Sequence, residues 1–256
     1  MITGGNGNLG TEYTRVLSKA GAKVAIFDIA DGLNKRLARL AKDYQIKFFK
    51  VDITDKQQIK KTLRKLEAVW DTPHILINNA ALDAPPGARP EENKSFESYS
   101  LASWQKTLDV NLTGVFLCSQ VIGSKMAKKG RGSIINISST YGVVSPNQNI
   151  YKYRAKQGRP FVKPVAYSAS KSAILNLTRY LATYWAKKGV RVNTLSPGGV
   201  FNNQDQEFLA GYARLTPMGR MANKNELNGA ILFLASDASS YMTGANLVVD
   251  GGWTAW

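Results

Sequence analysis

Short apolar runs alternate with longer amphipathic segments along the chain. The apolar runs have the length of buried strands, while the longer segments repeat apolar residues at helical spacing. Strands that alternate with helices predict a parallel sheet with helices on both faces and a ligand crevice at the carboxyl ends of the strands. Strands are predicted at residues 23–28, 46–51, 74–81, 133–139, 190–195 and 246–249, and helices at about 10–21, 56–69, 101–128 and 223–235.

This alternation continues without a linker. No proline-rich or low-complexity segment divides the 256 residues, of which 44% are hydrophobic. A chain of this length can bury a full core in one unit. We therefore predict a single α/β domain over residues 1–256.

A glycine-rich turn follows the first apolar residues. Glycines let the backbone turn tightly and approach a pyrophosphate, whose charge is met by amides at a helix N-terminus. Asp28 ends the next predicted strand, where a carboxylate accepts hydrogen bonds from a ribose diol and repels a 2′-phosphate. The pattern predicts a Rossmann-type doubly wound sheet that binds NAD in preference to NADP. The predicted contacts are Gly4, Gly5, Asn8, Leu9, Gly10 and Asp28.

The first predicted strand is unusually short. Only Met1 and Ile2 precede the turn, although a parallel strand needs about five residues. We therefore expect the natural chain to begin several residues earlier, or this start to be truncated. N-terminal sequencing or the genomic context would settle the point.

Tyr167 and Lys171 are four residues apart in a predicted helix, so their side chains share one face. A nearby ammonium favours phenolate and lowers the pKa of a phenol, which is ordinarily about 10. The alternative is an ordinary exposed helix pair. Tyr184 and Lys188 repeat the spacing roughly 25 Å away, too far to share a site.

Two further polar residues are predicted near the crevice. Asn111 lies in an apolar helical stretch, where an amide is either capped by a local partner or placed for function, because an unsatisfied buried amide is costly. Ser139 ends a buried strand, where its hydroxyl either binds a substrate oxygen or caps a turn.

The composition argues against several kinds of site and partner. One cysteine, Cys118, and one histidine, His74, make disulfides, zinc sites and serine–histidine catalysis hard to build, so no metal is expected. No apolar run reaches the length of a membrane span and no signal peptide is visible, which predicts a cytoplasmic protein without a membrane partner.

The formal net charge is +16, with 34 Lys+Arg against 18 Asp+Glu, which raises the question of an anionic partner. Much of the charge lies at spacings typical of the solvated faces of two helices, at residues 35–42 and 56–65. No zinc-finger or aromatic RNA-binding signature accompanies it. We therefore predict a lysine-rich surface without a specific nucleic-acid partner.

Taken in order, these motifs resemble those of the short-chain dehydrogenase/reductases over nearly the whole chain. The shared motifs are Thr3-Gly4 with Gly10, Asn78-Asn79-Ala80-Ala81, Asn111, Ser139, Tyr167 with Lys171, Pro197-Gly198, and Val249-Asp250-Gly251-Gly252. The resemblance implies a catalytic tetrad of Asn111, Ser139, Tyr167 and Lys171, and Gly142 favours Ser139 over Ser138. It also implies cofactor contacts at Asp52, Ile53, Asn79, Ala80, Ala81, Tyr167, Lys171, Pro197, Gly198 and Val200.

The resemblance also implies roles for the tetrad. Tyr167 exchanges the substrate proton, and Lys171 lowers the pKa of the phenol and binds the nicotinamide ribose. Ser139 polarises the substrate oxygen, and Asn111 holds a water that relays protons toward Lys171.

The chain departs from the family pattern at three places. Asn8 replaces the middle glycine of the turn, and because asparagine tolerates left-handed backbone, we expect binding to be kept. Ala81 stands where glycine is usual. The family often has a threonine after Pro197-Gly198 that holds the nicotinamide amide, and Asn202 and Asn203 lie nearest to that place here.

The largest departure is a basic insert at residues 147–163, between Ser139 and Tyr167, which contains five Lys/Arg and no acidic residue. We expect Arg154 and Arg159 to bind a substrate phosphate or carboxylate, because both form charge-assisted hydrogen bonds. Asn202 and Asn203 lie in a polar loop at about 200–222, which we expect to close over a hydroxylated substrate.

The sequence therefore predicts an oxidoreductase that transfers a hydride between NAD(H) and an alcohol or carbonyl of a small polar substrate. The chain resembles the family branch associated with bacterial flagellin glycosylation and surface-sugar biosynthesis, which implies a sugar or nucleotide sugar. Two alternatives are a 3-oxoacyl-carrier-protein reductase, which normally prefers NADPH, and a non-catalytic NAD-binding protein with an anionic partner. Trp253 and Trp256 near the C-terminus predict burial against a neighbour, as in a homodimer or homotetramer.

Overall fold

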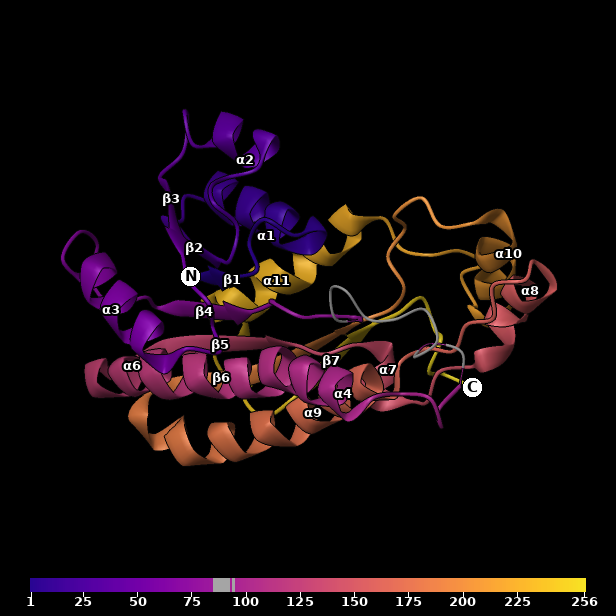
Figure 1. The fold of residues 1–256 in the computed structure, drawn as a ribbon. Coiled ribbons are helices and arrows are strands. Elements are labelled where there is room, and N and C mark those ends of the chain that lie inside the picture. Colours follow the sequence, from indigo (N-terminus) through magenta and orange to yellow (C-terminus); the bar gives the residue numbers. More distant parts are fainter. Residues whose placement is uncertain (85–92, 94) are drawn as a thin grey trace.

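The computed structural model describes residues 1–84, 93 and 95–256, and its strands form one parallel sheet of seven (Figure 1). The strand order is β3-β2-β1-β4-β5-β6-β7, so the chain winds from β1 to one edge and then crosses to the other. The predicted doubly wound α/β fold is confirmed. The strands are β1 Ile2–Thr3, β2 Val24–Asp28, β3 Ile46–Lys50, β4 Ile75–Asn78, β5 Gly132–Ile137, β6 Val190–Pro197 and β7 Asn246–Val249.

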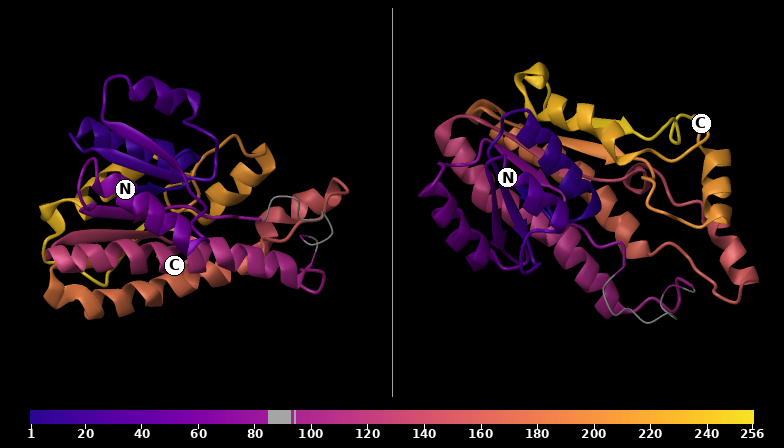
Figure 2. Two further views of the ribbon diagram at one scale, coloured as in Figure 1. Left: turned by 60° about the vertical axis from the view of Figure 1, so that its left-hand side comes forward. Right: turned by 90° about the horizontal axis from the view of Figure 1, so that it is seen from above.

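Helices cover both faces of this sheet (Figure 2). On one face, Tyr13, Leu37 and Ile231 belong to a buried core that includes the central strands. On the other face, Leu63, Ile122 and other apolar residues build a second core. The first face carries α1 Asn8–Lys19, α2 Lys35–Leu40 and α11 Asn228–Ala235, and the second carries α3 Lys56–Glu67, α4 Leu101–Leu108, α5 Val115–Cys118, α6 Ser124–Lys129 and α9 Val165–Trp185. No helix in the described residues combines the length and apolar character needed to cross a bilayer.

The first strand joins the two halves of the sheet although it has only two residues. Ile2 pairs with Ile26 of β2 and with Ile77 of β4, and it is fully buried. The Met1 ammonium donates a hydrogen bond to the Ile75 carbonyl at 2.7 Å, and burial lowers the pKa of this group to about 5.

The helix predicted at residues 101–128 is continuous from Leu101 to Lys129, but two stretches within it are π-helical. These stretches are Asp109–Gly114 and Ser119–Gly123. Single π-helical turns inside α-helices occur frequently at functional sites. The first stretch carries Asn111, one of the predicted site residues.

A third, smaller core lies beyond the carboxyl edge of the sheet, where Figures 1 and 2 show α8 and α10 at the same end of the molecule. Tyr212 stacks on Trp253 with ring centroids 4.5 Å apart, and Tyr151 packs on Phe208 at 5.5 Å. The elements involved are a 3₁₀ turn at Gln148–Tyr151, α8 Lys152–Lys156 and α10 Gln206–Leu215.

This core corrects two predictions. Residues 200–222 are not only a loop, because Phe208, Tyr212 and Leu215 give residues 206–215 the apolar spacing of a helix. Trp253 is buried against aromatic rings of its own chain and not against a neighbour, whereas Trp256 is 78% exposed in the single chain, so its burial against a neighbour stays a prediction.

Candidate active site

Ser139, Tyr167 and Lys171 line one cavity of about 300 Å³ at the carboxyl edge of the sheet. Tyr167 lies in the first turn of α9 and Lys171 one turn further on, while Ser139 follows β5 and caps α7 (Thr140–Val143). The structure therefore brings together the three residues as the sequence predicts. The wall of the cavity also includes four aromatic residues, namely Tyr141, Tyr151, Phe208 and Tyr212.

Tight packing of α7 against α9 places Ser139 beside Tyr167. A Cβ atom at Gly142 would lie 2.4 Å from Ser138 Oγ and 2.6 Å from the Lys171 carbonyl oxygen, so the helices approach this closely only with glycine. Ser138 is buried and donates to that carbonyl at 2.7 Å. Ser139 Oγ accepts from the Tyr141 amide at 3.1 Å, so Ser139 caps a turn, while its place in the cavity wall leaves binding of a substrate oxygen as a prediction.

Burial sets the protonation of Tyr167 and Lys171. It raises the pKa of the Tyr167 phenol to about 12, a rise that the hydrogen bond with Ser139 partly offsets. It lowers the pKa of the Lys171 ammonium to about 8, against a smaller opposing effect of Asp83. The pKa of the phenol is therefore raised in the polypeptide alone, and the lowering by Lys171 stays a prediction. Loss of hydration is the largest cause of this rise.

Asn111 connects the π-helical turn to the strand end at β4. Its Oδ1 accepts from the Leu82 amide at 2.7 Å, and its Nδ2 donates to the Leu82 carbonyl at 2.9 Å and to Ser170 Oγ at 3.1 Å. Ser170 Oγ in turn donates to the Tyr167 carbonyl at 2.8 Å. The buried amide is thus satisfied locally, and it ties the loop after β4 to the turn of α9 that carries Tyr167.

A second cavity, of about 600 Å³, lies over the glycine-rich turn. Gly4 has φ +62, and a Cβ atom there would lie 2.8 Å from Ala80 Cα. A Cβ atom at Gly10 would lie 2.2 Å from the Gly4 carbonyl oxygen, so neither position accepts a side chain. Gly5 and Gly10 do not line this cavity but pack beneath it. The predicted cofactor residues that line it are Gly4, Asn8, Leu9, Asp28, Asp52, Ile53, Asn79, Ala80 and Ala81.

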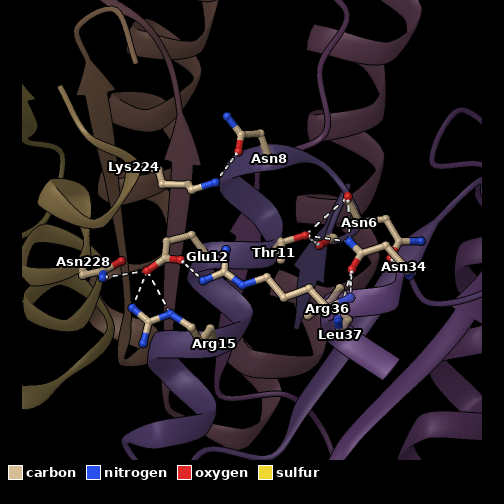
Figure 3. A network of polar contacts seen from close by, with 11 residues as sticks. Asn6, Asn8, Thr11, Glu12, Arg15, Asn34, Arg36, Leu37, Lys224 and Asn228 are labelled. Carbon is tan, nitrogen blue, oxygen red and sulfur yellow. Dashed lines mark hydrogen bonds and ion pairs between the residues drawn. The ribbon is translucent and has the colours of Figure 1, made fainter. Parts of the chain in front are cut away.

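The Asp28 carboxylate is held in place at the end of β2. Its Oδ2 accepts from the Asn6 amide at 3.0 Å, and its Oδ1 accepts from the Ala30 amide at 3.1 Å. Asn6 and Asn34 join the glycine-rich turn to the segment after β2: Asn6 Oδ1 accepts from the Asn34 amide at 3.0 Å, and Asn34 Nδ2 donates to Thr11 Oγ1 at 2.8 Å (Figure 3).

The two cavities share Leu9, Asn79 and Ala81 in their linings, so they meet at the N-terminus of α1. The first amides of a helix have no acceptor within the helix and attract anions. A carboxylate at one end, helix amides in the middle and Tyr167 at the other end fit an extended dinucleotide. Pro197, Gly198 and Val200 line the end of this path near Tyr167.

Asn8 differs from the expectation of a left-handed residue in the turn. It is the first residue of α1, and the left-handed position is Gly4. Its Oδ1 accepts from Lys224 Nζ at 3.4 Å (Figure 3). Asn8 has helical backbone, which asparagine adopts readily, so no glycine is required at this position.

The four predicted substrate residues do not line either cavity. Arg154 stacks its guanidinium on Phe161 at 5.0 Å, and Arg159 donates to Gln157 Oε1 at 2.8 Å. Asn202 and Asn203 are exposed. In this structure the side chains of Arg154 and Arg159 pack within the insert and those of Asn202 and Asn203 face solvent, so their contacts with a substrate stay predictions.

Two neighbours of these residues line the catalytic cavity instead. Gln204 donates to the Val200 carbonyl at 3.0 Å and accepts from the Asn202 amide at 2.7 Å. Lys163, the last residue of the basic insert, has its Nζ 4.7 Å from the centroid of the Tyr167 ring. Both belong to segments that the sequence marks: Gln204 lies in the polar loop at about 200–222, and Lys163 is one of the five Lys/Arg of the basic insert.

The other tyrosine–lysine pair lies outside the site. Tyr184 is 58% exposed, and Lys188 Nζ lies 5.2 Å from the centroid of its ring. Among the residues that the structure describes, no group of three or more histidine, cysteine, aspartate or glutamate side chains is arranged to hold a metal ion.

Comparisons with known proteins point to one family. Residues 5–254 match a family model described as enoyl-(acyl carrier protein) reductase. The chain is 32% identical to the NAD-dependent glycerol dehydrogenase of Listeria innocua, over 99% of this chain and 92% of that protein.

Solved structures of other proteins are also similar to this chain over nearly its whole length. A short-chain dehydrogenase from Leptospira borgpetersenii with bound NAD+ has a TM-score of 0.86 and 35% sequence identity, with 99% of this chain and 91% of that one covered. A gluconate 5-dehydrogenase from Burkholderia cenocepacia in complex with NADP and tartrate has a TM-score of 0.85 and 30% identity, with 100% and 94% covered.

Proposed function

Because the chain belongs to the short-chain dehydrogenase/reductase family, we propose that it is an NAD-dependent dehydrogenase of small polyhydroxylated alcohols. It is an oxidoreductase that transfers a hydride between a nicotinamide cofactor and a polar alcohol or carbonyl. The observation that carries the proposal is the path from the Asp28 cavity to the cavity of Ser139 and Tyr167.

Each tetrad residue has a role that its contacts support. A bound oxidised nicotinamide would supply the hydride acceptor and a positive charge in the site. Tyr167 takes the proton of the substrate hydroxyl as phenolate, the form that the positive charge of a bound nicotinamide would favour. Ser139 Oγ accepts from the Tyr141 amide and is hydrogen-bonded to Tyr167, and we expect its hydroxyl proton to turn to the substrate oxygen when substrate binds. Lys171 supplies a cation on the same helical face. Both Nδ2 protons of Asn111 are used, by the Leu82 carbonyl and Ser170 Oγ, so a relay water at this side chain would donate to Oδ1, which accepts one hydrogen bond from the Leu82 amide.

The substrate class rests on the relatives and on the cavity. Glycerol, galactitol and gluconate dehydrogenases are among the similar proteins. Ring faces and phenol groups of Tyr141 and Tyr151 in the cavity wall suit a carbon chain that bears hydroxyls. The branch of flagellin glycosylation and surface-sugar biosynthesis stays a prediction, so nucleotide sugars belong in the substrate panel.

The preference for NAD rests on Asp28. Similar structures hold NAD+ in one case and NADP in another, so the relatives do not decide it. The Asn6 and Ala30 amides hold the Asp28 carboxylate in the cavity, where it accepts from a ribose diol and repels a 2′-phosphate.

The test is a rate measurement at 340 nm with both nucleotides. The panel contains polyols, aldoses, nucleotide sugars and acyl thioesters. We expect turnover of a polyol or sugar, with kcat/KM at least about tenfold higher for NAD than for NADP. Turnover restricted to acyl thioesters, or no turnover with any alcohol or carbonyl, contradicts the proposal.

We also propose that the protein self-associates. Exposed apolar residues lie on two neighbouring helical segments of one face, Leu101 and Phe116 on one and Tyr180 and Tyr184 on the other. Such patches support an interface between copies. Light scattering coupled to gel filtration tests this, and a monomer at micromolar concentration contradicts it.

A further inference from the structure

The charge of the catalytic cavity is positive. In the described part of the chain, its lining holds Lys163 and Lys171 but no carboxylate. Lys171 Nζ donates one proton to the Ile137 carbonyl at 2.7 Å, and we expect its other protons to serve the nicotinamide ribose. Lys163 Nζ faces the rings of Tyr167 and Tyr141, at 4.7 and 5.8 Å from their centroids.

Lys163 is held in place far more firmly than a surface lysine. Its side chain is only 13% exposed. Its backbone amide donates to Gln148 Oε1 at 2.9 Å, and the amide of Val162 donates to the Asn93 carbonyl at 2.6 Å. Little conformational freedom is therefore lost when this ammonium binds a ligand.

Lys163 forms an ion pair with Asp83, and a substrate carboxylate can take the place of the Asp83 carboxylate. Asp83 Oδ1 lies 2.5 Å from Lys163 Nζ, but the Asp83 side chain is 59% exposed and does not line the cavity. Water screens such a pair, so it contributes little to stability. A carboxylate inside the cavity binds the same ammonium where less water competes, which strengthens the attraction.

On the basis of the proposed function, we propose that Lys163 binds a carboxylate of the substrate, so that the preferred substrates are small polyhydroxy acids. The closeness of its ammonium to Tyr167 places the carboxylate within a few carbon atoms of the hydroxyl that Tyr167 deprotonates. One available ammonium matches a singly charged carboxylate better than a doubly charged phosphate.

The experiment compares substrates that differ only in one end group: threonate with threitol, and gluconate with glucitol. The wild-type enzyme is expected to have a kcat/KM at least about tenfold higher for the acid. Lys163→Met lowers this acid-to-polyol ratio by about 10- to 100-fold, mainly through KM of the acid. Lys156→Met, an exposed position of the same insert, keeps the wild-type ratio.

Three results would overturn the inference. The first is an acid-to-polyol ratio that Lys163→Met leaves unchanged. The second is a fall in kcat for both substrates without a change in KM, since Lys163 would then act on the proton transfer of Tyr167. The third is a preference for a sugar phosphate over the matching acid.

Asp83→Asn tests whether the Asp83 carboxylate competes with the substrate carboxylate for Lys163. Removal of the competing carboxylate is expected to lower KM of the acid several-fold. A rise in KM as large as that of Lys163→Met would identify the ion pair as a structural link and overturn the inference.

Binding separates this inference from the proposed function. Calorimetric titration of threonate into the protein, with and without NAD+, requires no turnover. Weaker binding to Lys163→Met than to Lys156→Met supports the carboxylate site even if no alcohol is oxidised, whereas equal binding overturns it.

Discussion

Lys171 Nζ lies 5.8 Å from the centroid of the Tyr167 ring, nearly the distance at which Lys188 lies over Tyr184, 5.2 Å. The two pairs share one spacing and one helical segment but differ in burial. Lys171 is 4% exposed, whereas Lys188 and Tyr184 face solvent. Burial, rather than the spacing, therefore shifts the pKa values of Tyr167 and Lys171.

Replacement of Lys171 by methionine is expected to stabilise the protein without added nucleotide. The pKa of Lys171 falls to about 8 in the folded protein because burial disfavours the ammonium. Below pH 8 the buried ammonium is charged and destabilises the fold to its full extent. Lys171→Met should raise the free energy of unfolding by about 2 kcal/mol at pH 7. The gain should vanish as the pH rises from about 8 to 10.5, because the unfolded chain then loses the proton too.

Urea unfolding at pH 7 and pH 10 checks this prediction. Lys188→Met is the matched control, since its ammonium is already hydrated, and it should change stability by less than about 0.5 kcal/mol at either pH. A Lys171→Met protein that is less stable at pH 7 would show that the hydrogen bond to Ile137 outweighs desolvation.

Tyr167→Phe is expected to lower kcat at least about 1,000-fold, because phenylalanine fills the same space but cannot exchange a proton. The dissociation constant of NAD, measured by fluorescence titration, should change less than about fivefold. Tyr184→Phe is the control and should retain full activity. Turnover that survives Tyr167→Phe would exclude this phenol as the proton acceptor.

The arrangement of the strands and of Ser139, Tyr167 and Lys171 could be predicted because each depends on local spacing or on the carboxyl ends of parallel strands. Helix α10 was missed because Asn202, Asn203 and Asp205 give its N-terminal flank the composition of a loop. The apolar face of α10 stabilises a helix only when it packs on Trp253, which lies far along the chain.

Two features of the site depend on three-dimensional packing that no local pattern contains. The pKa of Tyr167 rises because several segments together exclude water from it. The spacing of residues in the sequence does not show how far a side chain is buried. The basic insert was expected to act through Arg154 and Arg159, but Arg154 stacks on Phe161 within the insert, and of its five Lys/Arg only Lys163 lines the cavity.

Asn111→Leu is expected to destabilise the protein by about 2 kcal/mol. Leucine has a similar volume, but it leaves the amide and carbonyl of Leu82 without their partner. Ser170→Ala is the control, because it preserves both bonds to Leu82 and should cost about 1 kcal/mol or less. Equal urea midpoints for the two variants would show that water replaces Asn111 at Leu82.

Glu12 is the residue that anchors α1, the helix beneath the second cavity, and its carboxylate is only 1% exposed (Figure 3). It pairs with Arg15, binds Arg36 Nη2 at 2.9 Å, and accepts from Asn228 Nδ2 at 2.9 Å. These contacts, that with Arg15 above all, lower the pKa of Glu12 to about 2. The carboxylate therefore stabilises the fold above its ordinary pKa near 4.5, and this contribution is lost as the pH falls toward 2.

Glu12→Gln should lower the free energy of unfolding by about 3 kcal/mol at pH 7, and the difference from wild type should shrink steadily between pH 4.5 and pH 2. Urea unfolding at pH 7 and pH 3 measures both values. Glu226 is the matched control: its pKa is also lowered to about 2 by Arg220, but the pair is exposed. Water screens that pair, so Glu226→Gln should have a smaller effect. Equal losses for the two variants would mean that burial adds nothing to the Glu12 contacts.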